Sequence, residues 1–143
     1  MARYKTRIHT AMPLEQAFDF MADLRNFADW DPGVSSAKQV QGEGPGPDAV
    51  FEVVANGVTL TYHTNDYKRP QRVVAEANTD RLRSYDVITL EAADGGCIVT
   101  YDAALELKGW YRVFEPAMRL MFRRIGSQAD EGLQKALDGR KVG

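Results

Sequence analysis

A chain of 143 residues has the usual size of one domain, and 44% hydrophobic with 27% charged residues is typical of a globular protein. With 18 basic and 20 acidic residues the net charge is −2, which argues against nucleic acid as a partner, because phosphate binding favours a basic excess. The single cysteine, Cys97, excludes an internal disulfide and a cysteine-rich metal site. No apolar run approaches a membrane span and the first residues contain no apolar signal core, so we expect a soluble, cytoplasmic protein with a single domain over residues 1–143.

The N-terminal segment predicts one strand followed by two short helices. Residues 2–9 alternate between an apolar face and a basic face, which is typical of a half-buried strand. Pro13 suits the first turn of a helix, where its missing N–H would be unpaired, and apolar residues follow at helical spacing through Met21. A second short helix or a turn is expected over residues 24–28, before proline and glycine at positions 32 and 33 end regular structure.

A period of two dominates from residue 34 to about residue 107. Glycine and proline at 42–48 predict a loop, and Asn56-Gly57 is a strong signal for a two-residue hairpin. Consecutive strands joined by hairpins predict an antiparallel sheet. For one of these strands, residues 84–91, the pattern leaves open which face points inward. The six strands are expected over residues 34–41, 51–55, 58–64, 73–77, 84–91 and 99–107.

The period returns to 3.6 after Gly109, which predicts a long C-terminal helix. Pro116 either starts this helix or kinks one that begins near Trp110. From Pro116 to Leu137 the helix would be roughly 33 Å long. Its apolar stripe consists of Met118, Phe122, Ile125, Ala129, Leu133 and Leu137.

Each of the seven strands has one apolar face, so the sheet needs one cover, and the C-terminal helix is the only element long enough to supply it. We therefore predict an α+β fold. It consists of a strongly twisted, seven-stranded antiparallel sheet wrapped around the long C-terminal helix, with two short helices after the first strand.

This layout resembles the helix-grip fold of the START and Bet v 1-like (SRPBCC) superfamily, and within it the small bacterial proteins of the polyketide cyclase/dehydrase type. The resemblance covers essentially the whole chain and is carried by diffuse motifs. It implies a cavity between the sheet and the long helix that holds apolar or aromatic small molecules, and it implies no single chemistry. The motifs are MPLEQAFDFMADLRNFADWDPGV with Asp23 and Trp30-Asp31-Pro32, GGCIVTYDAALELKGW, the breaker at Pro116, and FRRIGSQADEGLQKAL.

If the cavity exists, strand alternation and the helical stripe indicate which side chains would contact a ligand. Methionine suits irregular apolar ligands, although it also fills cores. On the long helix we expect Met118, Met121, Phe122 and Ile125 to face the sheet. The candidate ligand-binding residues are Trp30, Phe51, Val53, Leu60, Tyr62, Val99, Tyr101, Ala103, Met118, Met121, Phe122 and Ile125.

Three polar residues are candidates for proton transfer if the protein is an enzyme. Tyr62 and Tyr101 fall on apolar strand faces, where a hydroxyl would orient a ligand carbonyl or polarise an enolate, or would simply pair with the backbone in a core. Asp86 would be a general base with a raised pKa if buried, but an exposed position is the expectation for a lone Asp.

Other motifs give no site. The glycines of residues 42–46 are interrupted by Pro45, which removes an amide donor that a phosphate cradle would use. His9 and His63 are the only histidines and lack metal-ligand spacing, so we expect no metal and no cofactor. Asp19 and Asp23 are expected on a solvated helix face, with Asp23 holding the following loop. Arg112, Arg119 and Arg123 are expected to be solvated, with contact to an anionic membrane as a minor alternative.

Three classes of function follow. The leading hypothesis is binding or transport of a hydrophobic small molecule, such as a lipid, an isoprenoid or an aromatic polyketide-like compound. The alternative is a polyketide cyclase, aromatase or dehydrase, in which the Tyr and Asp candidates move protons. The third is a protein-interaction module with a vestigial cavity. We expect a monomer or weak homodimer with at most transient membrane contact.

Overall fold

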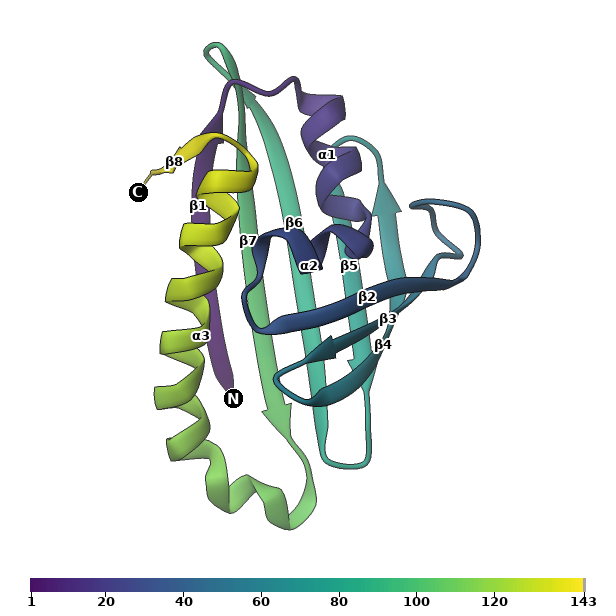
Figure 1. The fold of residues 1–143 in the computed structure, drawn as a ribbon, viewed down its shortest axis with the longest axis vertical. Coiled ribbons are helices and arrows are strands. Elements are labelled where there is room, and N and C mark those ends of the chain that lie inside the picture. The colour runs from purple at the N-terminus through teal and green to yellow at the C-terminus, as the bar shows by residue number, and fades with distance from the viewer. Residues whose placement is uncertain (143) are drawn as a thin grey trace.

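The computed structural model describes residues 1–142 and has the α+β architecture predicted from the sequence, with one large antiparallel sheet and a long C-terminal helix (Figure 1). The seven expected strands are all present. The elements in chain order are β1 (Ala2–Thr10), α1 (Leu14–Ala22), η1 (Leu24–Asn26), α2 (Phe27–Trp30), β2 (Val34–Gln41), β3 (Val50–Ala55), β4 (Val58–Lys68), β5 (Arg72–Asn78), β6 (Leu82–Ala93), β7 (Gly96–Leu107), η2 (Gly109–Phe114), α3 (Glu115–Ala136) and β8 (Gly139–Lys141).

The strands lie in the order β2-β3-β4-β5-β6-β7-β1-β8. From β2 to β7 each strand pairs with the next along the chain, and the β3–β4 turn uses Asn56 and Gly57, both with positive φ, as a two-residue hairpin requires. The N-terminal strand β1 pairs antiparallel with β7, so that Ala2 lies opposite Leu105 and Thr10 opposite Cys97. The sequence missed β8, a three-residue strand after α3 that pairs with β1.

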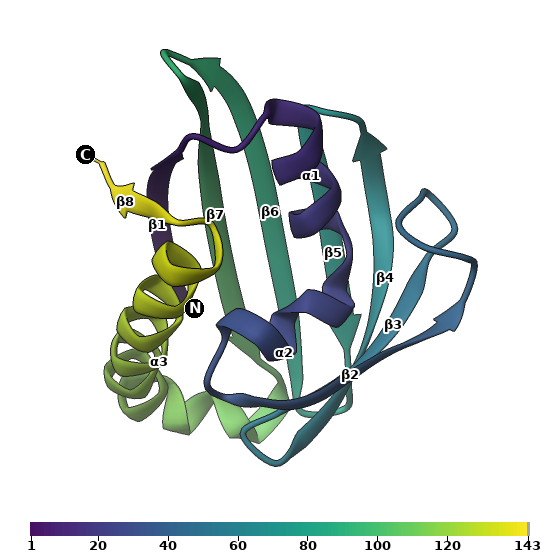
Figure 2. The same ribbon diagram turned by 45° about the horizontal axis from the view of Figure 1, so that its top comes forward.

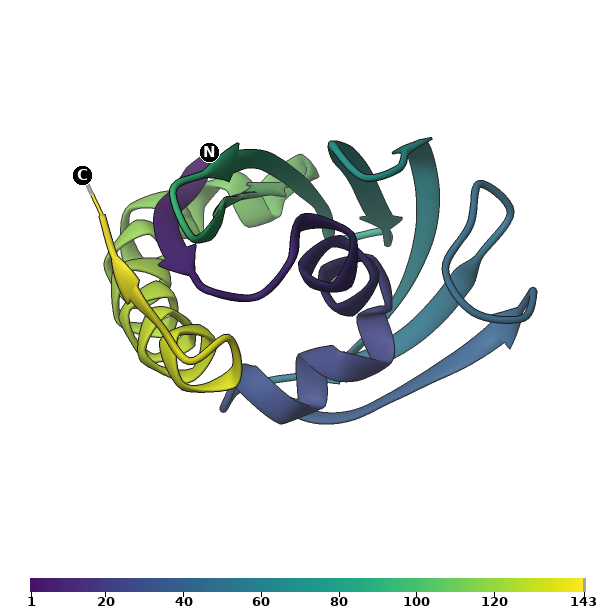
Figure 3. The ribbon, with the colours of Figure 1, turned by 90° about the horizontal axis from the view of Figure 1, so that it is seen from above.

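The sheet curves around the helices, with α1, α2 and α3 on its concave side (Figures 2 and 3). The prediction that the C-terminal helix alone covers the sheet is wrong. In the structure α3 packs against β1 and α2, whereas α1 covers β6 and β7. The buried face of α1 contributes Ala17, Phe18 and Met21 to the core. Two helical units therefore share the cover, and each protects a different part of the sheet.

The helix α3 begins next to the proline, which is one of the two alternatives predicted from the sequence, with Pro116 in the first turn. The preceding residues form a separate 3-10 helix, η2. Two glycines allow α3 to approach its neighbours closely. A Cβ at Gly126 would overlap the Tyr4 ring on β1, and a Cβ at Gly132 would overlap the Trp30 carbonyl oxygen on α2. Within residues 1–142, no helix combines the length and the hydrophobicity needed to cross a bilayer.

Candidate functional site

A cavity of about 250 Å³ lies between the sheet and the first part of α3. An apolar cavity of about 150 Å³ holds one benzene ring, so this space is large enough for a ligand bigger than a single ring. The exposed residues on its wall, Asn56, Val58 and Met121, mark its mouth between the β3–β4 hairpin and α3. The wall consists of Tyr4, Phe27, Asp31, Val34, Val53, Ala55, Asn56, Val58, Leu60, Tyr62, Leu82, Ser84, Asp86, Tyr101, Ala103, Leu105, Met118, Met121, Phe122, Ile125, Gly126 and Ala129.

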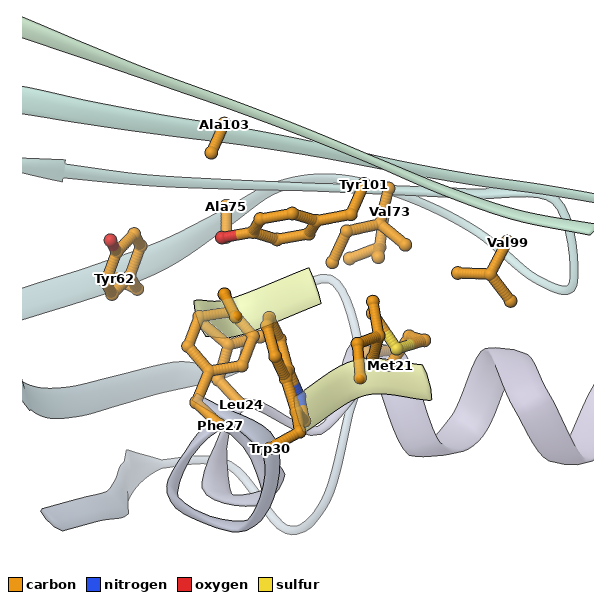
Figure 4. Packing of buried hydrophobic residues seen from close by; sticks show 14 of the residues in the cluster. Met21, Leu24, Phe27, Trp30, Tyr62, Val73, Ala75, Val99, Tyr101 and Ala103 are labelled. Carbon is orange, nitrogen blue, oxygen red and sulfur yellow. The ribbon is translucent and has the colours of Figure 1, made fainter. Parts of the chain in front are cut away.

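The cavity occupies only one end of the inner face of the sheet. Along β7, Tyr101 separates Ala103, which lines the cavity, from Val99, which belongs to the closed core near Met21 (Figure 4). Phe27 and Trp30 on α2 lie across from Tyr62 and Tyr101 on the sheet (Figure 4). The ring centroids of Trp30 and Tyr101 are 5.2 Å apart, in an edge-to-face arrangement that holds the Tyr101 ring in place.

Polar groups gather on the sheet side of the cavity, on β4, β6 and β7. The Tyr101 hydroxyl donates a hydrogen bond to Asp86 Oδ2 at 3.0 Å. The Tyr62 hydroxyl and Ser84 Oγ lie 2.7 Å apart and share a second hydrogen bond. Whichever of these two hydroxyls accepts keeps its own hydrogen, which is then available to a ligand. All four residues lie on the cavity wall and are buried.

Asp86 is a titratable group on the cavity wall whose ionisation is strongly altered by burial. Its side chain is buried, and this desolvation raises its pKa to about 7. The hydrogen bond from Tyr101 opposes the shift, and the carboxyl of Asp31 acts in the same direction as burial. Burial also raises the pKa of Asp31, whose Oδ1 accepts a hydrogen bond from the Gly33 amide at 2.9 Å. Burial raises the pKa values of Tyr62 and Tyr101 well above the usual range, so both hydroxyls stay protonated.

Asp86 corrects one expectation from the sequence. The sequence predicts an exposed position for this residue, but only 2% of its surface is accessible to solvent. The inward face of β6 carries Ser84 and Asp86 near the cavity and Ile88 and Leu90 in the core. Because the inward face is polar at one end, hydrophobic alternation does not identify it there.

The structure brings most of the predicted ligand-binding residues to one place. Three do not line the cavity: Trp30, Phe51 and Val99 are packed into the core. Met121 was expected to face the sheet, but it is 55% exposed and lies at the mouth. The predicted residues on the cavity wall are Val53, Leu60, Tyr62, Tyr101, Ala103, Met118, Met121, Phe122 and Ile125.

Several residues of the wall were not selected from the sequence. Tyr4, Ala55, Val58 and Leu105 lie on strand faces that alternation identifies as apolar, so a signal existed for them. Ser84 and Asp31 gave no such signal, because polar side chains are normally expected outside. Gly126 and Ala129 line the cavity because small side chains bring the α3 backbone close to it.

The other candidate groups lie away from the cavity. Asp19 pairs with Arg69 at 2.8 Å, and Asp23 caps η1 by accepting a hydrogen bond from the Arg25 amide, as expected for a residue that holds the following loop. His9 contacts the Asp94 carbonyl oxygen at 2.9 Å. Among residues 1–142, no three His, Cys, Asp or Glu side chains are grouped as metal ligands.

Comparisons with known proteins agree with this architecture. A family described as "Polyketide cyclase / dehydrase and lipid transport" matches residues 1–138. A START superfamily protein from Mycobacterium smegmatis has a similar structure, with a TM-score of 0.76 at 10% identity, covering 96% of this chain and 98% of that one. A protein from Helicobacter pylori gives a TM-score of 0.74 at 8% identity, with 95% and 86% covered.

Ara h 8.0201 is also similar in structure, with a TM-score of 0.54 at 18% identity over 89% of this chain and 93% of that one. No curated protein sequence matches significantly. At these identities the structural similarities establish the fold alone.

Proposed function

Because the chain belongs to the polyketide cyclase / dehydrase and lipid transport family and has the helix-grip fold, we propose that it binds a hydrophobic small molecule reversibly in the cavity between the sheet and α3. The observation that carries the proposal is the cavity of about 250 Å³ with largely apolar walls. Transfer of apolar surface from water contributes roughly 25 cal/mol per Å². A ligand that fills this space is therefore held without a covalent step.

The wall provides contacts for such a ligand from both α3 and the sheet. Met118, Met121, Phe122 and Ile125 come from α3, whose methionines adapt to irregular apolar shapes. Val53, Leu60 and Ala103 are buried and come from the sheet on the opposite side. Exposure of Met121 at the mouth supports reversible entry, because this residue belongs to both the wall and the surface.

The test uses N-phenyl-1-naphthylamine, an uncharged probe that fluoresces in apolar surroundings. Ala103→Trp fills the cavity from β7, so it is expected to weaken probe binding by more than about tenfold while the fold retains most of its stability. Ala104→Trp, on the opposite face of the same strand, is the matched control and should bind like the wild type. Failure of the wild type to bind the probe, or equal binding by both variants, would contradict the proposal.

A second candidate function is proton transfer on a bound ketone, and the observation that favours it is the buried Asp86 carboxyl on the cavity wall. With its pKa raised to about 7, Asp86 is a stronger base than an ordinary carboxylate. The carboxylate would take a proton from the carbon beside a ligand carbonyl. The electron pair of that C–H bond would form the C=C bond of the enolate, and the π pair of the carbonyl would move to its oxygen. The free hydrogen of the Tyr62–Ser84 pair would donate a hydrogen bond to that oxygen. Return of the proton regenerates the ketone.

Deuterium exchange into 2-tetralone, an enolisable bicyclic ketone, tests this second function by NMR. The rate above the buffer rate should rise with pH through about 7, because the ionised carboxylate is the base. Asp86→Asn should abolish the enhancement, and Asp94→Asn, in the exposed β6–β7 turn, should leave it intact. Exchange that continues in Asp86→Asn would remove Asp86 from the reaction.

A further inference from the structure

The polar groups on the cavity wall are acidic or neutral, and this imbalance of charge indicates a class of ligand. Asp31 and Asp86 both lie on the wall. Within the described chain, residues 1–142, no Lys, Arg or His side chain lines the cavity. A buried anion is held by a cationic or hydrogen-bonded partner in proteins. An anionic ligand would instead meet two carboxyl groups.

The hydrogen-bonding groups suit an uncharged polar ligand. Asp86 has acceptor capacity beyond the bond from Tyr101, so it can accept from a ligand hydroxyl. The hydroxyl pair of Tyr62 and Ser84 retains one hydrogen that can be donated to a ligand hydroxyl or carbonyl oxygen. A ligand with one such group would satisfy both, while its apolar part contacts α3 and the sheet.

We propose that the cavity selects uncharged apolar molecules that carry a hydroxyl or carbonyl group, and discriminates against organic anions such as carboxylates and phosphate esters. The inference rests on the proposed binding function and specifies its ligand class. It predicts that fatty acids bind more weakly than the corresponding alcohols. The carboxyl of Asp86 is the main source of the discrimination, because it is fully enclosed and ionises above a pH of about 7.

The test compares 2-naphthol with 2-naphthoate, which share one ring system, as competitors of N-phenyl-1-naphthylamine at about pH 8, where Asp86 is ionised. The expected result is displacement by 2-naphthol at a concentration at least about tenfold lower than by 2-naphthoate. Asp86→Asn should improve binding of 2-naphthoate and so reduce the ratio between the displacing concentrations of 2-naphthoate and 2-naphthol. Asp31→Asn is a second variant that should reduce the same ratio.

The outcomes separate the two proposals. Equal or tighter binding of 2-naphthoate by the wild type would overturn the selectivity while leaving the binding function in place. A ratio unchanged in both Asn variants would also overturn it, because the carboxyls would then have no part. Failure of the probe and of both naphthalenes to bind would overturn the binding function, and the selectivity with it.

A second inference comes from the surface beside the cavity mouth. Five large apolar side chains are exposed on η2 and the first half of α3, at the lower end of the molecule in Figure 1. Trp110 is 66% exposed and Leu120 is 72% exposed. We define the apolar patch as Trp110, Val113, Phe114, Leu120 and Met121.

The same segment is strongly basic although the whole chain has a net charge of −2. Residues 108–124 contain five basic residues and one acidic residue. That acidic residue, Glu115, is already engaged by the N-terminal amine at 2.9 Å. The four arginines of this segment, all exposed, are Arg112, Arg119, Arg123 and Arg124.

We infer that the apolar patch and its arginines dock reversibly on an anionic lipid surface. Exposed Trp and Leu insert at the boundary between headgroups and acyl chains, and arginines attract anionic headgroups. A second copy of the chain, placed symmetrically on the patch, would bring its own arginines against these four, so charge favours lipid over self-association. Met121 belongs to both the patch and the cavity wall, so docking would place the mouth against the membrane.

Vesicle sedimentation tests this surface with phosphatidylcholine alone and with phosphatidylcholine mixed with phosphatidylserine. The expected result is binding to the anionic vesicles that is at least roughly tenfold stronger and that weakens in high salt. The pair Arg123→Glu with Arg124→Glu, and separately Trp110→Ser with Leu120→Ser, should each abolish binding. Lys135→Glu, in the last turn of α3, combined with Arg140→Glu, in β8, is the control with the same charge change and should bind like the wild type.

Two results would overturn the docking surface. One is equal binding to both vesicle types or binding to neither. The other is a monomer–dimer equilibrium, measured by analytical ultracentrifugation, that Trp110→Ser abolishes, which would assign the patch to a second copy of the chain.

Discussion

At the scale of single residues, the carboxyl of Asp86 is buried at a position where its ionisation lowers the stability of the folded protein. The folded state holds the Asp86 proton more tightly than the unfolded chain, because burial raises its pKa from 3.8 to about 7. The contribution of this group to the free energy of unfolding is therefore greatest in acid and falls as pH rises through this window. A buried titratable group on a cavity wall, with its pKa raised by burial, is a candidate functional residue.

We predict that Asp86→Asn gains stability relative to the wild type as pH rises. The amide keeps an acceptor for Tyr101 and does not ionise, so the difference in the free energy of unfolding should grow by roughly 2–3 kcal/mol between about pH 5 and pH 8. Urea unfolding of both proteins at the two pH values measures this. A difference that stays constant with pH would mean that Asp86 is not desolvated in the folded state.

The sequence predicted inward-facing residues correctly where the inward positions of a strand carry apolar or aromatic side chains. Tyr62, Tyr101 and Ala103 were identified because their neighbours alternate cleanly with polar residues. Asp86 was not, because Tyr85 and Val87 make the outer face of β6 the more apolar one at that point. Alternation reports burial of apolar groups, so it fails at positions where a polar side chain is buried.

At the scale of elements, α3 is fixed mainly by its second half. Its buried residues are Gly126, Ala129, Asp130 and Leu133, and the Asp130 carboxylate accepts from Thr6 Oγ1 at 2.8 Å and pairs with Lys141 at 3.2 Å. These contacts join α3 to β1 and β8. The absence of a side chain at Gly132 lets the helix lie against the Trp30 carbonyl on α2.

We predict that Gly132→Ala is destabilising although alanine is the better helix former. Alanine gains about 1 kcal/mol over glycine in an open helix. The added methyl overlaps a backbone carbonyl that cannot rotate away, and overpacking typically costs about 1–3 kcal/mol. Chemical denaturation should show a net loss of stability, whereas Gln128→Ala, on the same helix, should change it by less than about 0.5 kcal/mol. A stabilised Gly132→Ala would refute the close approach.

Element types followed from the sequence because the period changes sharply, from 3.6 to two and back again near Gly109. The strand β8 was missed because Gly139–Lys141 is too short to show a period. The role of α1 as a second cover was also missed. Its length suggested a minor element, but its position over β6 and β7 depends on the curvature of the sheet, which no local pattern encodes.

At the scale of the whole molecule, the cavity depends on the difference between two ends of one sheet. Near α1 the inner face is closed by large side chains such as Phe18 and Met21. Opposite the first half of α3 the wall also contains small residues, Ala55 and Ala103 on the sheet and Gly126 on the helix, which leave space between the two. The sequence predicted a continuous inward face. The distance of each helix from the sheet determines which part of that face is filled by side chains and which part is left open. No local pattern encodes that distance, so the position of the cavity was not predictable.

We predict that the first half of α3 opens more easily than the second half. In α3, every residue of 115–125 is at least partly exposed, whereas the second half holds the buried residues. Hydrogen exchange followed by mass spectrometry should show backbone amides of residues 118–124 exchanging at least roughly tenfold faster than those of 129–136. Added 2-naphthol should slow the first group selectively. Uniform protection along the helix would contradict this.

The pairing of β1 with β7 also predicts the order in which the molecule assembles. The strands from β2 to β7 pair with sequence neighbours, so they can form as each hairpin leaves the ribosome. Ala2 pairs with Leu105, so the first strand to be synthesised has to wait for one of the last. During that wait β7 has an unpaired edge and α3 has no β1 to pack against. We therefore expect completion of the cavity wall, to which β1 contributes Tyr4, to be a late event of folding, because it requires closure of a long loop.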